Sequence, residues 1–385
     1  MAIQEYVIKN FMTALYKTNL QGAAALDEAI SSASKGKFAS TRQVISKLKK
    51  DIRRADNPQK FLKVYCGIDL DKPSAENGAH QNISQRNFTG DCFSAENSNL
   101  QIQLCFIDEN NVLKKMLTFN QLTDAQKIVW QNLRDWVERA ISLVKATYGD
   151  KFGFAGSSLD TPKTIYFGFY DKKNLALADT SFWAEKGGKT IRALMLKINM
   201  HFFGDLAQKN FRAEYIDITL AHEFTHCAMA ANINYFGCLP QFIKEGMAEY
   251  TCHGEITALK DGNILRLADK SALLKNGAEK SLLDVALDLT DTGTGKDISY
   301  SGGYMFICYF ARQVAIIFTI QIPKKSASIF EVTFYAIRAI VGLINSPAKI
   351  AGSAVTLHYA RDDSITKKIP IGVKFTSFHE RLEAA

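Results

Sequence analysis

Two histidines four residues apart, His222 and His226, enclose Glu223 in the stretch AHEFTHCAMA. The surrounding residues contain no Pro or Gly for over twenty positions, so we expect a helix. On a helix, residues i and i+4 lie one above the other on one face, which lets both imidazoles reach a single metal ion. Zinc accepts such nitrogens at roughly 2.0–2.1 Å. Glu223 lies one step round the helix, where a general base can reach a metal-bound water.

A second sequence feature is needed to support a zinc site, because an HExxH pattern arises by chance in on the order of one chain in a hundred of this length. A catalytic zinc site has three protein ligands and leaves the fourth position for water. Glu245 follows His226 with 18 residues between them, in the stretch LPQFIKEGMAEYTCHG. Pro240 suits the first turn of a new helix, and the small residues Gly246 and Ala248 would let two helices approach closely.

The HExxH-x18-E spacing resembles that of the gluzincin zinc metallopeptidases, the thermolysin-like and aminopeptidase clan, and the resemblance covers Thr164 to Phe310. It implies an α+β fold: a zincin-like catalytic domain with a small mixed sheet, an edge strand, the HExxH active-site helix and a helical C-terminal part, preceded by a mainly helical N-terminal region. It also implies one catalytic Zn2+ held by His222, His226 and Glu245. Peptide bonds would be hydrolysed by a zinc-activated water, with Glu223 as general base.

The same resemblance assigns roles to three more residues. Glu249, four residues after Glu245, would hold His222 through its other ring nitrogen, and an exposed acid is the alternative. Tyr300, and after it Tyr304, in the stretch DISYSGGYMFICYFARQ are the candidate groups for stabilising an oxyanion. An aromatic residue of the core or of the rim is the alternative for both.

Gluzincins commonly bind their substrate as an added strand along a sheet edge just before the HExxH helix. The strand that we predict at 193–200 fits this place. Its candidate substrate-binding residues are Ala193, Met195, Lys197 and Asn199.

Other zinc signatures are missing from the chain. The metzincin pattern would need Gly at Met229 and His at Asn232, and the GxMEN-like motif of aminopeptidases is absent, which favours an endopeptidase. Two alternatives stay open: a catalytically silent or latent zincin-fold surface or structural protein, and a zinc site that serves stability alone. A structural site would have four protein ligands, and Cys252 or His253 would be the fourth.

Periodicity and composition predict three regions: a helical N-terminal region at 1–66, a loop-rich segment with a β-hairpin at 67–122, and a metallopeptidase domain at 123–385. The hairpin strands LQIQLCFI and VLKKMLTF flank Asp108–Asn111. A helix that begins near Ser40–Thr41 carries a basic face, which is a contact patch or an ordinary solvated face. The N-terminal helices resemble the opening module of large bacterial surface or flagellin-like proteins that carry inserted peptidases.

Composition narrows the classes of partner. The net charge of +8 is mild for 385 residues, so we expect a peptide or protein substrate and no nucleic acid, while the oligomeric state stays open. Seven cysteines without a CxxC pattern favour free thiols. Glu5 and Lys9 interrupt the first apolar residues, so we expect no signal peptide, and no apolar run is long enough for a membrane span. The location is then cytoplasmic, or outside the cell after export by a signal-independent route.

Overall fold

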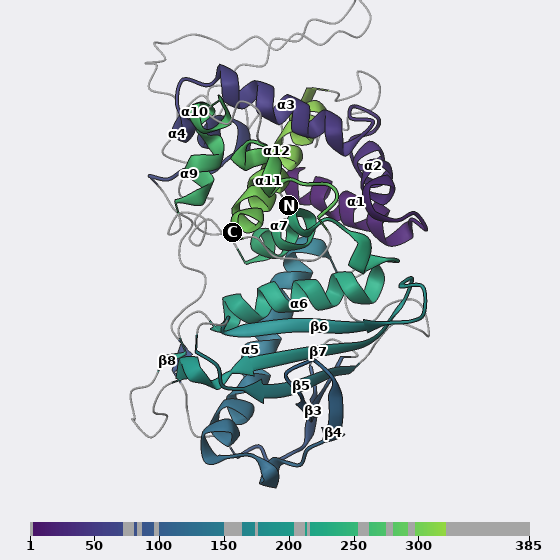
Figure 1. Ribbon diagram of the computed structural model, residues 1–385, viewed down its shortest axis with the longest axis vertical. Helices are drawn as coiled ribbons and strands as arrows, with labels where there is room; N and C mark the ends of the chain where they lie inside the picture. The colour runs from purple at the N-terminus through teal and green to yellow at the C-terminus, as the bar shows by residue number, and fades with distance from the viewer. Residues whose placement is uncertain are drawn as a thin grey trace, which may run out of the picture. The chain divides into compact units, whose positions relative to one another are not determined.

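The computed structural model describes residues 3–71, 81–82, 87–95, 100–149, 164–173, 176–203, 212–213, 216–252, 262–274, 280–291 and 297–320. By its contacts the chain divides into two compact units, Met1–Ile316 and Ile317–Ala385, and the described part of the second is 317–320. The first unit is mixed α/β with a mixed sheet, consistent with the expected α+β class (Figure 1). None of the helices described is long and apolar enough to cross a membrane.

The N-terminal region is helical, as its periodicity predicted. Its elements are α1 (Ile3–Lys17), α2 (Gly22–Ala33), α3 (Thr41–Arg54), α4 (Pro58–Phe61) and the π-helical turn η1 (Leu62–Cys66). Ser40 caps α3 by accepting a hydrogen bond from the main-chain N–H of Gln43 at 3.3 Å. Pro58 stands in the first turn of α4, where a helix needs no N–H donor.

These helices pack against α12 (Asp297–Ile320), although the two segments are far apart in sequence. The rings of Phe11 and Phe310 lie 5.6 Å apart between centroids, and Tyr309 donates a buried hydrogen bond of 2.6 Å to Asp51 of α3. The boundaries predicted at residues 66 and 122 therefore both fall inside one compact unit.

The main sheet has the strand order β2-β3-β5-β7-β6, and β4 also pairs with β3. The strands β3, β5 and β7 run parallel, whereas β2, β4 and β6 are each antiparallel to their neighbour. The predicted hairpin is confirmed as β3 and β4. The strands are β2 (Cys92–Ser94), β3 (Gln101–Ile107), β4 (Leu113–Met116), β5 (Thr164–Tyr170), β6 (Ala178–Ala184) and β7 (Ile191–Asn199), with β1 (Gln81–Asn82) and β8 (Arg212–Ala213) as a separate pair.

The expectation that the strand at 193–200 forms the sheet edge is wrong. This strand is β7, and it lies between β5 and β6 (Figure 1). Met195, for example, is opposite Tyr166 on one side and Ser181 on the other. Because both sides of its main chain are paired, β7 cannot accept a peptide as an added strand. Among the described strands, the one that ends the sheet on this side is β6.

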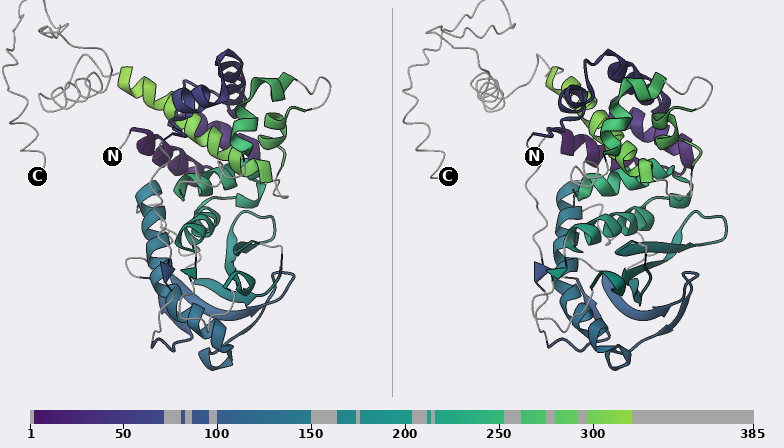
Figure 2. Two further views of the ribbon diagram at one scale, coloured as in Figure 1. Left: turned by 90° about the vertical axis from the view of Figure 1, so that its left-hand side faces the viewer. Right: turned by 60° about the vertical axis from the view of Figure 1, so that its left-hand side comes forward.

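Two long helices, α5 (Asp124–Tyr148) and α6 (Ile216–Asn232), lie against the sheet (Figure 2). Thr123 begins α5 with a capping box, and Gly149 ends it with a φ of 83°. The Trp130 ring of α5 lies 5.4 Å from that of Phe167 on β5, while α6 packs beside β6 and β7. The HExxH helix, α6, thus packs against the part of the sheet where β6 runs antiparallel to β7.

The helix that follows, α7 (Gln241–Thr251), crosses α12 at two glycines. A Cβ added at Gly303 would lie 2.1 Å from the Phe242 carbonyl oxygen, and one added at Gly246 would lie 2.4 Å from the Gly303 carbonyl carbon. The main chains therefore touch at this crossing, which leaves no room for a side chain. The other short helices among the described residues are η2 (Phe119–Gln121), η4 (Met200–Phe203), η5 (Phe236–Cys238), α9 (Asn263–Ala268), α10 (Lys270–Leu274) and α11 (Leu282–Ala286).

Candidate metal centre

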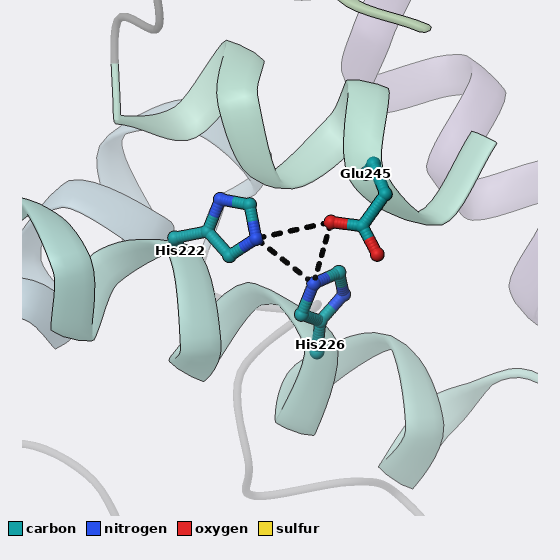
Figure 3. A group of neighbouring side chains, drawn as sticks. All are labelled: His222, His226 and Glu245. Carbon is teal, nitrogen blue, oxygen red and sulfur yellow. Dashed lines mark hydrogen bonds and ion pairs between the residues drawn. The ribbon is translucent and has the colours of Figure 1, made fainter. Parts of the chain in front are cut away.

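Three side chains from two helices meet at one point in the first unit. His222 and His226 stand one turn apart on α6, and Glu245 reaches them from α7 (Figure 3). The Nε2 atom of His222 lies 3.1 Å from Nε2 of His226 and 3.1 Å from Oε2 of Glu245. The third side of the triangle, from His226 Nε2 to Glu245 Oε2, is 3.3 Å. The structure thus brings together the three residues that the spacing singled out.

The triangle matches the dimensions of a metal site. A tetrahedral zinc ion with bonds of roughly 2.0–2.1 Å separates its ligand atoms by about 3.3–3.4 Å. The three measured separations of 3.1, 3.1 and 3.3 Å are close to this value. Two imidazole nitrogens and a carboxylate oxygen are also a donor set that zinc accepts. The group could therefore hold a metal ion.

The proton on His222 adds a second argument. The Nδ1 atom of His222 lies 3.0 Å from Glu249 Oε1, so a proton on Nδ1 can be donated to this carboxylate. In that tautomer the Nε2 atom carries a lone pair that faces another nitrogen and a carboxylate oxygen. Such atoms repel one another unless a positive charge lies between them.

The environment of His222 favours positive charge. Burial alone would lower the pKa of His222, but Cys252, Glu245 and Glu249 together raise this pKa well above its ordinary value. Without a metal ion, a proton satisfies the same lone pairs. The carboxylates around His222 thus favour positive charge at this point of the site.

Glu245 is oriented by Gln241, a residue that sequence reasoning missed. The side-chain amide of Gln241 donates to Oε1 of Glu245, so Oε2 is the oxygen that faces the histidines. Burial alone would raise the pKa of Glu245, but His226 and His222 hold it well below its usual range, and the carboxyl group is ionised. The signal in the sequence was the i, i+4 spacing of Gln241 and Glu245 on one helix.

Cys252 belongs to a second group of ligand-type atoms, with His222 and Glu249. Glu249 contacts Nδ1 of His222, the ring nitrogen that points away from His226 and Glu245. Cys252 lies in the group with Glu249, so the geometry does not favour Cys252 as a fourth ligand of an ion bound at Nε2 of His222. His253, the other candidate for a fourth ligand, lies outside the described residues.

Glu223 is 8% exposed and lies on the turn of α6 between the two histidines. Its main-chain carbonyl accepts a hydrogen bond of 3.3 Å from the Thr180 hydroxyl, which places this turn against β6. Burial raises the pKa of the Glu223 carboxyl group, and the positive charges of His222 and His226 oppose this only in part. A carboxylate with a raised pKa is a stronger proton acceptor.

Of the two tyrosines expected at the site, Tyr300 has a contact with the cluster. Its ring stacks on that of His222, with centroids 5.8 Å apart and planes 13° from parallel. Burial raises the pKa of the Tyr300 hydroxyl, which keeps it protonated and able to donate. Tyr304, one turn further along α12, is buried at 4% exposure.

The four residues expected to bind substrate lie on β7, inside the sheet. Met195, Lys197 and Asn199 are buried there, and Lys197 makes an ion pair of 3.6 Å with Asp179 of β6. Ala193 is opposite Trp183 of β6. These four residues support the end strand and do not form a sheet edge.

No family model, curated protein or solved structure matches this chain. The residues of the site and their geometry are therefore what indicates a function for this chain.

Proposed function

We propose that this protein is a zinc-dependent peptidase of the gluzincin type, a hydrolase that acts as an endopeptidase. One observation carries the proposal: three ligand atoms of His222, His226 and Glu245 converge at 3.1–3.3 Å, and the buried acid Glu223 shares their helix turn. When bound, zinc would lower the pKa of a water molecule and polarise the scissile carbonyl group.

The side chains of this chain would divide the remaining work. Glu223 would accept the proton of the attacking water and deliver it to the leaving amine. Its buried position on the helix turn between the two histidines suits both steps, since the same carboxyl group must take up the proton and then release it. Tyr300 would donate a hydrogen bond to the substrate carbonyl oxygen as negative charge develops there. The stacking of Tyr300 on His222 supports this role.

The substrate would be held by β6 rather than by β7. An extended peptide can add to the edge strand of a sheet through main-chain hydrogen bonds, which depend on backbone shape more than on sequence. β6 ends the described sheet on this side, and the Thr180 hydroxyl joins it to the turn that carries Glu223. A peptide paired with β6 would therefore pass beside the proposed base.

The competing function is a catalytically silent or latent zincin-fold protein with a structural zinc ion, on a surface or within an assembly. Such a site would have four protein ligands and would not need a base. The group that includes Nε2 of His222 has three such ligands among the described residues, and the buried acid Glu223 lies on the same helix turn. These two facts favour the peptidase.

The test combines metal content with cleavage of an unstructured protein, for the wild type and Glu223→Gln. We expect about one zinc ion per chain in both proteins, and cleavage that falls by at least about a hundredfold in the variant. Glu109→Gln, the same change at a side chain that is 74% exposed, is the matched control and should cleave normally.

Zinc bound by both proteins without cleavage by either would favour the silent zincin over the peptidase. A wild type that binds no zinc after reconstitution would exclude both functions. Cleavage that Glu223→Gln leaves unchanged would show that another group acts as the base.

A further inference from the structure

Three buried hydroxyl groups connect the helices around the metal centre. We propose that those of Tyr148, Thr225 and Thr251, here called the hydroxyl chain, are a positioning unit that fixes α6 and α7 at the separation needed for metal binding. The inference rests on the proposed metal centre, because it concerns how the two helices that carry the ligands are held. It assigns a role to residues that do not face the ion themselves.

The hydroxyl chain runs through three helices. Thr225 of α6 bonds to Thr251 of α7 at 3.0 Å, and Thr251 bonds in turn to the hydroxyl of Tyr148 on α5 at 2.6 Å. Tyr148 donates to the main-chain carbonyl of Met247, also on α7. Both threonines also lie within hydrogen-bond distance of a carbonyl oxygen one turn earlier on their own helices, Ala221 and Met247.

The three protons of the chain can all be placed. The Tyr148 proton goes to the Met247 carbonyl, the Thr251 proton to the tyrosine oxygen, and the Thr225 proton to the Thr251 oxygen. Thr225 and Thr251 are fully buried and Tyr148 is 4% exposed. A satisfied and buried network of this kind fixes one arrangement of its helices, because each bond has a required length and direction.

The chain is close to the ligands along both helices. Thr225 directly precedes His226, and Thr251 comes two residues after Glu249, the partner of His222. Two ligands come from α6 and the third from α7, so the helix separation sets the distances between ligand atoms. Metal–ligand distances tolerate changes of only about 0.2 Å, which makes that separation critical. Apolar residues of the same shape would pack the two helices together without fixing the distance between them.

The experiment measures the zinc dissociation constant of the full chain by competition with a chromophoric chelator. Thr251→Val removes the central hydroxyl with little change of shape, and Tyr148→Phe removes the end of the chain. We expect each to weaken zinc binding by about tenfold, the lower end of the range for residues that orient metal ligands. Thr251→Ser keeps the hydroxyl and should bind zinc nearly as tightly as the wild type.

Matched controls separate positioning from general stability. Tyr309→Phe removes a buried tyrosine hydroxyl bond between α12 and α3, and Thr147→Val removes a threonine bond within α5. Each should change the thermal midpoint of the metal-free protein and leave the zinc dissociation constant unchanged. The absorption spectrum of the cobalt(II)-loaded protein reports ligand geometry, and we expect it to change in Thr251→Val but not in Tyr309→Phe.

Zinc affinities of Thr251→Val and Tyr148→Phe that stay within twofold of the wild type would overturn the inference and leave the proposed function standing. Equal weakening by Thr251→Ser and Thr251→Val would also overturn it, because the hydroxyl would then not be the cause. A wild type that binds no zinc would overturn both proposals.

Discussion

The Nδ1 atom of His222 faces the carboxylate of Glu249 at 3.0 Å. This contact holds the ring in the orientation that turns Nε2 toward His226 and Glu245. The resemblance to gluzincins implied this pair, and the spacing adds only that Glu249 lies on the same face of its helix as Glu245, four residues earlier. Gln241 shares such a spacing with Glu245, but this pair has no signature of its own, because glutamine four residues from an acid is common on ordinary helix surfaces.

The carboxylate of Glu249 should therefore affect a metal ion that it does not touch. We expect Glu249→Ala to weaken zinc binding by about 10–100-fold, because His222 loses the partner that fixes its tautomer and ring orientation. Glu249→Gln keeps an oxygen acceptor and should have a smaller effect. Chelator competition measures both constants. Wild-type affinity in Glu249→Ala would show that Glu249 has no part in orienting His222.

At the scale of the elements, the sequence predicted α6, α7 and the strand β7, but β6 was missed. Of the first four residues of β6, Ala-Asp-Thr-Ser, only Thr180 is of a type that favours strands, and tertiary pairing with β7 overrides that weak preference. A signal was present nevertheless. Gly187 and Gly188 have positive φ angles of 97° and 73°, and a Gly-Gly turn before a strand indicates a hairpin.

The crossing of α7 and α12 offers a second test of an element. Gly303→Ala would place a Cβ 2.1 Å from the Phe242 carbonyl oxygen, so one helix must shift. We expect a loss of about 1–3 kcal/mol or more in the free energy of unfolding, measured by urea denaturation. Zinc binding should weaken as well, because α7 carries Glu245.

Gly237→Ala is the control for this change, since its new Cβ would make ordinary contacts at 3.7 Å with the Phe182 ring. Urea midpoints that agree between Gly303→Ala and the wild type would contradict the close crossing of the two helices.

Across the whole molecule, the N-terminal helices share a core with α12, which carries Tyr300. Local patterns predicted each helix, but they contain no information on which distant segment covers it. The joint core of α1 and α12 depends on residues about three hundred positions apart, such as Phe11 and Phe310. This is why the sequence indicated a separate N-terminal region.

Because the core is shared, damage at α1 should reach the metal centre. Phe11 is fully buried, so Phe11→Ala should lower the free energy of unfolding by about 3–5 kcal/mol. We expect loss of helical circular dichroism and release of zinc to occur together in one urea transition. Tyr6→Ala on the same helix is the control, because Tyr6 is 48% exposed. Two separate transitions, with the helices lost before zinc, would show that the N-terminal helices fold independently.

The end strand β6 also has a consequence for how the protein behaves at high concentration. An edge strand that could bind a substrate peptide could equally pair with the same strand of another copy of the protein. Unprotected edge strands lead to aggregation in this way. β6 is seven residues long, with the exposed Trp183 near its end, and the turn that follows carries the charged residues Glu185, Lys186 and Lys189. A short strand beside charged side chains discourages long self-pairing, so under the proposed function the same few residues would affect both solubility and substrate binding.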